Sequence, residues 1–70
     1  MEPFKDHLRS IRLTRNYTQL QVAQAIGITE RNYQYYEAGK REPSMSNLIA
    51  LADFFDVTLD YLVGRSDKPK

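Results

Sequence analysis

Apolar residues recur along this chain at intervals of three and four positions, the period of a helix that packs one face against a core. In the first part of the chain the stripe consists of Phe4, Leu8 and Ile11, and it predicts a helix over about residues 3–15. A second stripe predicts a helix over about residues 45–55 and consists of Leu48, Leu51, Ala52 and Phe55. Strand-like alternation of apolar and polar residues is absent, so the pattern predicts an all-α protein.

Between and after these stripes one local pattern occurs three times: a threonine with an apolar residue directly before it and another four positions after it. Threonine is a favourable N-cap, and apolar residues at this spacing form a hydrophobic staple across a helix start. The pattern predicts helices that begin after Thr18, Thr29 and Thr58, and Ser44 can cap the helix over residues 45–55. Five helices are therefore expected.

The second and third predicted helices are joined by a tight turn. Gly27 can adopt the left-handed conformation that ends a helix, and Thr29 can begin the next helix almost at once. A connection this short does not let the two helices lie antiparallel, so we expect a sharp crossing, as in a helix-turn-helix. The small side chain of Ala23 permits the helices to cross closely.

Composition narrows the possible functions. The 70 residues suffice for one domain, expected over residues 1–64, and the polar residues 65–70 are expected to form a flexible tail. The chain has no cysteine and one histidine, and it lacks a glycine-rich phosphate loop and any metal-ligand spacing, so we expect no enzyme, no metal and no cofactor. No apolar run approaches the roughly 20 residues of a membrane span, and no signal-peptide pattern is present, which predicts a soluble, cytoplasmic protein.

The charge distribution says more than the net charge of +1. Residues 1–41 carry seven Lys/Arg and four Asp/Glu, whereas residues 42–70 carry three and five. The half that holds the two crossed helices is therefore basic. Such asymmetry is typical of a protein with one face that binds a polyanion, although ordinary scatter in a short chain explains it equally well.

A fixed register joins Thr18-Gln19, Ala23, Gly27-Ile28-Thr29, Tyr36-Glu37, Gly39-Lys40 and Pro43-Ser44. Together these residues resemble the helix-turn-helix of the Cro/cI-type phage repressors, the XRE family, and the resemblance extends from about Phe4 to Gly64. It implies a five-helix, lambda-repressor-like fold and a small transcriptional regulator, a repressor of phage or mobile-element type, that binds double-stranded DNA. Asn16 stands where the family usually has glycine, and Tyr33 where it has isoleucine or valine. The larger ring at Tyr33 needs more space and a partner for its hydroxyl.

The third predicted helix, over residues 29–38, is expected to enter the major groove. A helix turns about 100° per residue, so an outer face lies opposite Tyr33, Tyr36 and Glu37 if these three face the core. Arginine and glutamine at that face can pair bidentately with guanine and adenine. The predicted base-reading residues are Glu30, Arg31, Gln34 and Tyr35. An ordinary solvated helix face is the alternative, and for Glu30 the helix dipole offers a further one.

Phosphate contacts would fix the orientation of the domain on DNA. The resemblance implies that Gln19 is the phosphate-binding glutamine of the family. Lys40 and Arg41 follow the third helix and suit the backbone on its other side, and Asn32 and Ser46 are weaker candidates. The resemblance also implies a buried salt bridge between Arg12 and Glu37, which would link the first and third helices.

Repressors of this kind usually dimerise on palindromic operators, so we expect a homodimer. Apolar residues beside the main stripes are the predicted dimer surface, namely Ile49, Phe54, Tyr61 and Val63; local packing on the core is the alternative. The rival function is a protein-binding helix-turn-helix module, such as an antitoxin or a regulator sequestered by a protein antagonist. The basic region around the third helix and the presence of Gln19 favour DNA.

Overall fold

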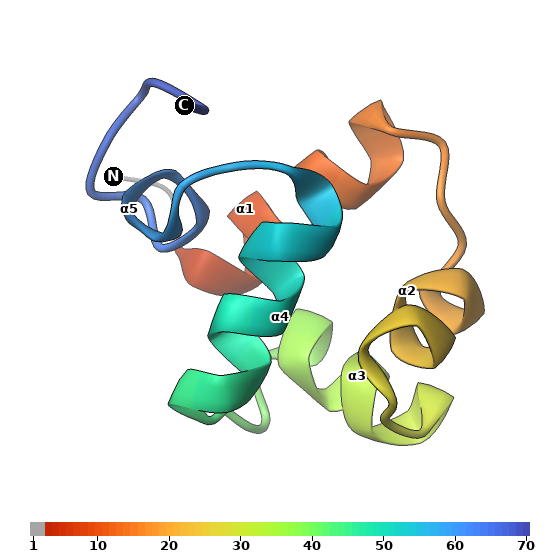
Figure 1. Ribbon diagram of the computed structural model, residues 1–70. Helices are drawn as coiled ribbons and strands as arrows, with labels where there is room; N and C mark the ends of the chain where they lie inside the picture. Colours follow the sequence, from red (N-terminus) through yellow and green to blue (C-terminus); the bar gives the residue numbers. More distant parts are fainter. Residues whose placement is uncertain (1–2) are drawn as a thin grey trace.

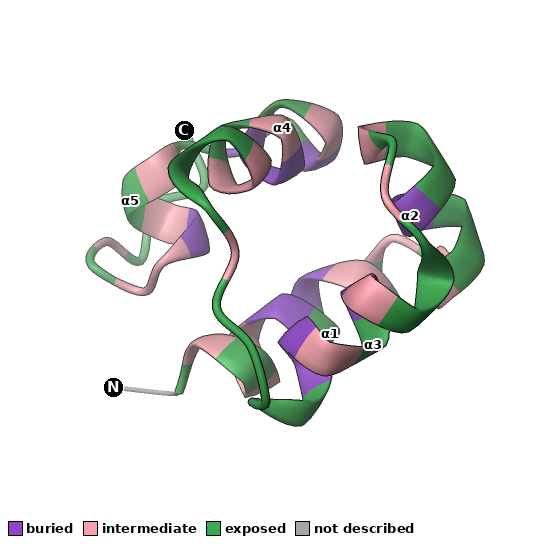
Figure 2. Cartoon of the chain, turned by 90° about the horizontal axis from the view of Figure 1, so that it is seen from below, coloured by how far each residue is buried: buried purple, intermediate pink, exposed green. Residues whose placement is uncertain are grey.

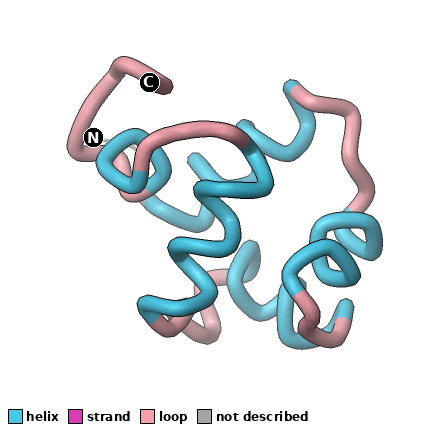
Figure 3. Tube along the Cα trace, in the orientation of Figure 1, coloured by secondary structure: helices cyan, strands magenta, loops and turns pink. Residues whose placement is uncertain are grey.

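Five α-helices form the fold in the computed structural model, which describes residues 3–70: α1 (Phe4–Thr14), α2 (Gln19–Ile26), α3 (Glu30–Ala38), α4 (Met45–Phe55) and α5 (Leu59–Leu62) (Figure 1). The described residues contain no strand, and loops connect the helices (Figure 3). The all-α, five-helix prediction is confirmed. The first helix is one residue shorter at each end than predicted, because Pro3 is its N-cap and Arg15 its C-cap.

All four predicted caps are present. The side chains of Thr18, Thr29, Ser44 and Thr58 each accept a hydrogen bond from the backbone N–H three residues further on. Thr18 forms a complete capping box, because its own N–H also donates to Oε1 of Gln21 over 2.8 Å. Since each cap satisfies a backbone donor that the helix itself leaves free, the starts of α2 to α5 are fixed by local sequence.

The turns that follow α1, α2, α3 and α4 use the left-handed conformation. Gly27 ends α2 with φ of 78°, and Gly39 ends α3 with φ of 74°. Asn16 adopts φ of 61° in the turn after α1, so asparagine performs the role that the family usually gives to glycine. Asp56 does the same after α4 with φ of 58°. Short polar side chains tolerate this conformation better than other non-glycine residues do.

The hydrophobic core lies where the helices meet. In Figure 1, α4 crosses in front of α1, with α5 on one side and the α2–α3 pair on the other. Figure 2 shows buried residues on the inward sides of the helices, and the core consists of Leu8, Ile11, Val22, Ala23, Tyr33, Tyr36, Leu51, Ala52, Phe55, Val57 and Leu62. Ala23 is fully buried, as expected for the residue that lets α2 and α3 cross closely.

The C-terminal tail folds back toward the start of α5. The backbone N–H of Thr58 donates to the carbonyl oxygen of Pro69 over 2.8 Å, and the Lys70 ammonium pairs with the Asp56 carboxylate. Both partners of that ion pair are exposed, so its contribution to stability is small. The flexibility expected of residues 65–70 stays a prediction.

Candidate nucleic-acid interface

The helix α3 divides into a buried side and an exposed side. Tyr33, Tyr36 and Glu37 are buried, as the spacing predicted. Opposite them, Glu30, Arg31 and Gln34 are exposed, while Tyr35 is half-buried. The structure therefore brings the predicted base-reading residues together on one side of a helix of nine residues. That helix is about 13 Å long, which suits the width of a DNA major groove.

The ion pair that the resemblance implies is present between α1 and α3. Arg12 Nε donates to Oε2 of Glu37 over 2.7 Å, and Nη2 donates to Oε1 over 3.0 Å. The remaining nitrogen, Nη1, donates to the carbonyl oxygen of Tyr17 over 2.9 Å. Glu37 is charged and yet buried, with 3% of its surface exposed. A two-point pair of this kind fixes both the distance and the rotation of α1 against α3.

Opposing effects act on the pKa of the Glu37 carboxyl. Burial is the largest single effect and would raise this pKa, but the surrounding hydrogen-bond donors, with Arg12 first among them, and the positive charge of Arg12 together outweigh burial and hold the pKa below its ordinary value. Tyr33 lies beside the same carboxylate, and burial together with that negative charge raises the pKa of its phenol. Glu37 is thus charged and Tyr33 neutral at physiological pH. The Tyr33 hydroxyl has no hydrogen-bond partner within the described part of the chain, so the partner expected from the sequence is missing.

Gln19 and Arg9 approach the same carboxylate from the exposed side. Gln19 Nε2 donates to Oε1 of Glu37 over 3.2 Å. Arg9 Nε lies 3.8 Å from that oxygen, beyond hydrogen-bond range, and the Arg9 side chain is 52% exposed. Glu37 neutralises Arg12, so Arg9 contributes an excess positive charge beside Gln19. Sequence reasoning missed Arg9, although it precedes Arg12 by three residues and therefore lies on the same side of α1.

The two cationic residues of the loop after α3, Lys40 and Arg41, differ in their contacts. Lys40 is exposed, and its backbone N–H donates to the Tyr35 carbonyl oxygen at the end of the helix. Arg41 folds back along α3: its Nη1 donates to Oδ1 of Asn32 over 2.8 Å, and its Cζ lies 5.1 Å from the centre of the Tyr35 ring. Asn32 and Arg41, both predicted as phosphate ligands, therefore contact each other.

The start of α4 approaches α3 through a hydrogen bond that the sequence did not predict. Asn47 Nδ2 donates to the Tyr36 hydroxyl over 2.9 Å, and Asn32 Nδ2 approaches the same hydroxyl at 3.4 Å. Ser46, the last predicted phosphate ligand, is exposed on the first turn of α4. No signal in the sequence distinguishes Asn47 from other polar residues in a first helical turn.

The predicted dimer residues differ in how far they are exposed. Ile49 is 47% exposed. Phe54 instead packs on Tyr17, with ring centres 4.8 Å apart, and Tyr61 packs edge-on against His7 at 5.0 Å. Both are half-buried against the core.

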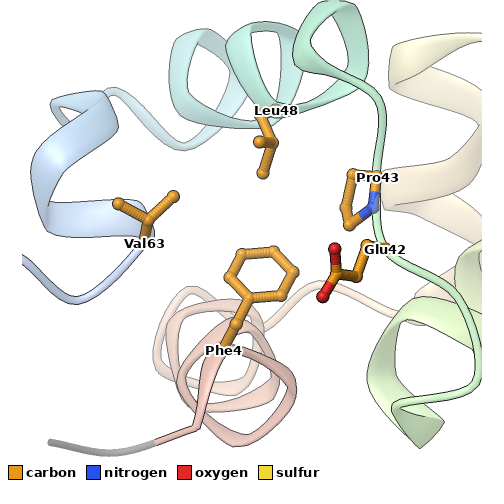
Figure 4. Close-up of a pocket in the computed structure, with 5 residues that line it drawn as sticks. All are labelled: Phe4, Glu42, Pro43, Leu48 and Val63. Carbon is orange, nitrogen blue, oxygen red and sulfur yellow. The ribbon is translucent and has the colours of Figure 1, made fainter.

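Val63 belongs to a small apolar pocket. It lines a space of about 140 Å³ together with Phe4, Glu42, Pro43 and Leu48 (Figure 4). The pocket lies between the starts of α1 and α4 and the end of α5, as the labelled side chains in Figure 4 indicate. Of the four predicted dimer residues Ile49 is the most exposed, and the dimer surface stays a prediction. Met45 lies one turn before it on α4 and is 62% exposed.

Other kinds of site have little basis in the described residues. Residues 3–70 contain no group of three or more His, Asp or Glu side chains that could hold a metal ion. None of the helices described is long and apolar enough to cross a membrane.

Comparison with known proteins identifies the family. The family model described as Helix-turn-helix matches residues 8–62. The chain belongs to the helix-turn-helix family. The match includes all of α2 and α3, and most of the rest of the bundle, so the resemblance stated from the sequence is confirmed.

Relatives of this helix-turn-helix chain include named regulators. It is 41% identical over 61 residues to the cryptic phage CTXphi transcriptional repressor RstR of Vibrio cholerae, a match that covers 87% of this chain and 54% of that protein. It is 39% identical over 62 residues to the uncharacterized HTH-type transcriptional regulator YobD of Bacillus subtilis, covering 89% and 55%. The chain thus spans about half the length of the curated relatives it matches.

Among solved structures, the helix-turn-helix chain is similar to the P22 c2 repressor crystallised with a synthetic operator. The TM-score is 0.86 at 21% sequence identity, and the match covers 94% of this chain and all of that one. At this identity the likeness concerns the fold. It confirms the predicted lambda-repressor-like arrangement of five helices.

Proposed function

We propose that this chain binds double-stranded DNA in a sequence-specific manner as part of a transcriptional regulator of the repressor type, with α3 in the major groove. The observation that carries the proposal is the division of α3: its core side is anchored by Glu37 to α1, and its outer side presents Arg31 and Gln34. The name of RstR, a transcriptional repressor 41% identical to this chain, supports the same role.

In this proposal the exposed side of α3 reads base edges. Arg31 pairs with guanine and Gln34 with adenine, because their side chains offer the two-point hydrogen bonding that these bases present in the major groove. Glu30 accepts from a cytosine amino group at the start of the helix. Tyr35 is the fourth member of this surface, and the Arg41 guanidinium lies over its ring.

Gln19, Lys40 and Ser46 would contact phosphates on either side of α3, and we add Arg9 to this set. Glu37 can only accept hydrogen bonds, so it turns the amide nitrogen of Gln19 toward itself and leaves the second N–H of that nitrogen for an anion. Arg9 is half-exposed beside the same amide and too far from Glu37 to be hydrogen-bonded. A phosphate at the start of α2 would therefore contact both side chains and the helix N-terminus.

We further propose that the protein binds a palindromic operator as a homodimer. Exposed Ile49 and Met45 on α4 form the apolar surface on which this proposal rests. Two copies related by a twofold axis would place their α3 helices about 34 Å apart, one turn of DNA. Binding to the chromosome or a mobile element would place the protein in the cytoplasm.

Selection of bound sites from a pool of random duplexes, followed by gel shifts at low and moderate salt, tests the proposal. We expect one enriched half-site in inverted repeat and an affinity that falls with salt, with a log–log slope of about −2 per subunit for two cationic contacts. Retention of no duplex, or binding without any salt dependence, would contradict the proposal. That outcome would favour the protein-binding module instead.

A further inference from the structure

We propose that Arg41 reads a base, most simply guanine, from the edge of α3, and that Tyr35 and Asn32 hold its guanidinium in position for this contact. The inference rests on the proposed DNA-binding function and deepens it. It assigns a specificity role to a loop residue that sequence position alone suggests is a phosphate anchor.

The guanidinium of Arg41 lies against α3. Arg41 belongs to the loop after α3, yet its Nη1 donates to Oδ1 of Asn32 over 2.8 Å and its Cζ lies 5.1 Å from the centre of the Tyr35 ring. Asn32 and Tyr35 are three residues apart on α3, so they are neighbours along one edge of the helix. The charged end of Arg41 therefore lies on the helix that is proposed to enter the groove.

The Asn32 amide that holds Arg41 is itself held by hydrogen bonding to the core. Asn32 directs its amide nitrogen toward the Tyr36 hydroxyl, at 3.4 Å, and Asn47 of α4 donates to that hydroxyl over 2.9 Å. Tyr36 is buried, so the amide of Asn32 is oriented from the core outward, with its oxygen toward Arg41. A guanidinium held by a hydrogen bond and a ring face loses less rotamer entropy on binding than a free side chain does.

Two of the three guanidinium nitrogens of Arg41 remain to bind a ligand. In Arg12 all three guanidinium nitrogens donate within the protein, and the charge is neutralised by Glu37. Arg41 instead uses Nη1 on a neutral amide, so its charge is not cancelled by that partner. Within residues 3–70 the structure shows no hydrogen bond from its Nη2 or Nε, which can therefore donate to a ligand. A planar fork with two donors free matches O6 and N7 of guanine in the major groove.

This arrangement changes the role of Tyr35. Arg41 lies over its ring, and Tyr35 is half-buried although it belongs to the exposed side of α3. Cation–π contact favours the stacked guanidinium, so the ring serves as a platform for Arg41 rather than as a base-reading side chain itself.

Arg41→Lys is the decisive variant, because lysine keeps the positive charge for a phosphate but lacks the planar fork that reads guanine. The base preference of each variant is measured at every position of the selected half-site, in competition against single-base changes. We expect Arg41→Lys and Arg41→Ala to flatten the preference at one position by roughly 10- to 100-fold. Tyr35→Ala should flatten the same position, whereas Tyr35→Phe, which keeps the ring face, should not.

Lys40→Ala is the matched control from the same loop, and it should weaken binding to all sequences alike. Arg41 is exposed, so its variants are expected to fold, and a thermal melt checks this directly. If Arg41→Lys keeps the full base preference, or Arg41→Ala weakens every sequence equally, Arg41 is a phosphate contact and the inference is wrong while the proposed function stands. If the wild-type protein selects no DNA sequence, both are wrong.

Discussion

Arg12 and Glu37 join α1 to α3 through two parallel hydrogen bonds of 2.7 and 3.0 Å. The Arg12 side chain is 11% exposed and that of Glu37 3% exposed, so the carboxylate has almost no water as an alternative partner. The pair therefore connects the stability of the fold with the orientation of the proposed recognition helix.

Arg12→Ala is expected to destabilise the domain by about 3–5 kcal/mol, because it leaves the Glu37 carboxylate buried without its counter-charge. A domain of 70 residues has a free energy of unfolding of roughly 4–10 kcal/mol, so this variant is expected to be close to unfolded. Arg12→Lys keeps the positive charge but cannot form both parallel hydrogen bonds to Glu37, so its loss of stability should be smaller. Urea denaturation measures all three proteins. Arg9→Ala is the control, since the Arg9 side chain is half-exposed and lies 3.8 Å from Glu37, so its removal should cost at most about 1 kcal/mol.

Stability should also fall in acid because of Glu37. Its pKa is lower in the folded protein than its ordinary value of 4.5, so the unfolded chain takes up a proton first as the pH decreases. The stabilisation is fully present above pH 4.5 and is lost as the pH falls through the folded-state pKa. Urea midpoints measured between pH 7 and pH 3 check this. Glu37→Gln should show a smaller decrease over the same range, and an equal decrease would mean that other carboxyls are responsible.

Tyr33→Phe is expected to stabilise the protein. The Tyr33 ring is fully buried, and its hydroxyl has no hydrogen-bond partner within the described residues. Its removal therefore eliminates a desolvation cost while keeping the ring in the core, and we expect a gain of up to about 1 kcal/mol in the free energy of unfolding. Thermal or urea unfolding provides the measurement. A loss of similar size would show that the hydroxyl binds Glu37 in solution.

Three substitutions should separate base reading from phosphate contact. Arg31→Ala should relax base preference at one position by about 1–3 kcal/mol. Lys40→Ala should weaken binding to all sequences and reduce the salt slope by roughly one unit. Gln19→Ala should also weaken all sequences but leave the salt slope unchanged, because glutamine carries no charge. Fluorescence anisotropy on the selected site and its single-base variants, over a range of salt concentrations, distinguishes the three patterns. Uniform loss in Arg31→Ala would remove it from the reading surface.

Two apolar residues of α4 should respond in opposite ways to substitution. Ile49→Asp is expected to weaken self-association without lowering the stability of the monomer, because Ile49 is exposed. Phe54→Ala should instead destabilise the fold, since Phe54 packs on the rings of Tyr17 and Phe55. Sedimentation equilibrium gives the association constant, and urea denaturation gives the stability. Unchanged association in Ile49→Asp would move the dimer surface elsewhere.

The sequence by itself determined where α2 to α5 begin and where the left-handed turns after α1 and α2 lie. Thr18, Thr29, Ser44 and Thr58 cap backbone donors within three residues, and Gly27 and Asn16 supply the left-handed turns, so these features depend on local chemistry that a linear pattern records. The helical period likewise placed Tyr33, Tyr36 and Glu37 on the buried side of α3.

Tertiary structure decided which side chains remain available for binding. The guanidinium of Arg41 lies over the Tyr35 ring, and Arg9 and Gln19 both lie beside the Glu37 carboxylate. The rings of Phe54 and Tyr61 pack against Tyr17 and His7. Most of these contacts join residues far apart in the sequence, and they depend on how one helix is rotated and displaced against another. Helical periodicity gives the face of a side chain on its own helix, but it carries no information about the neighbour that packs against that face.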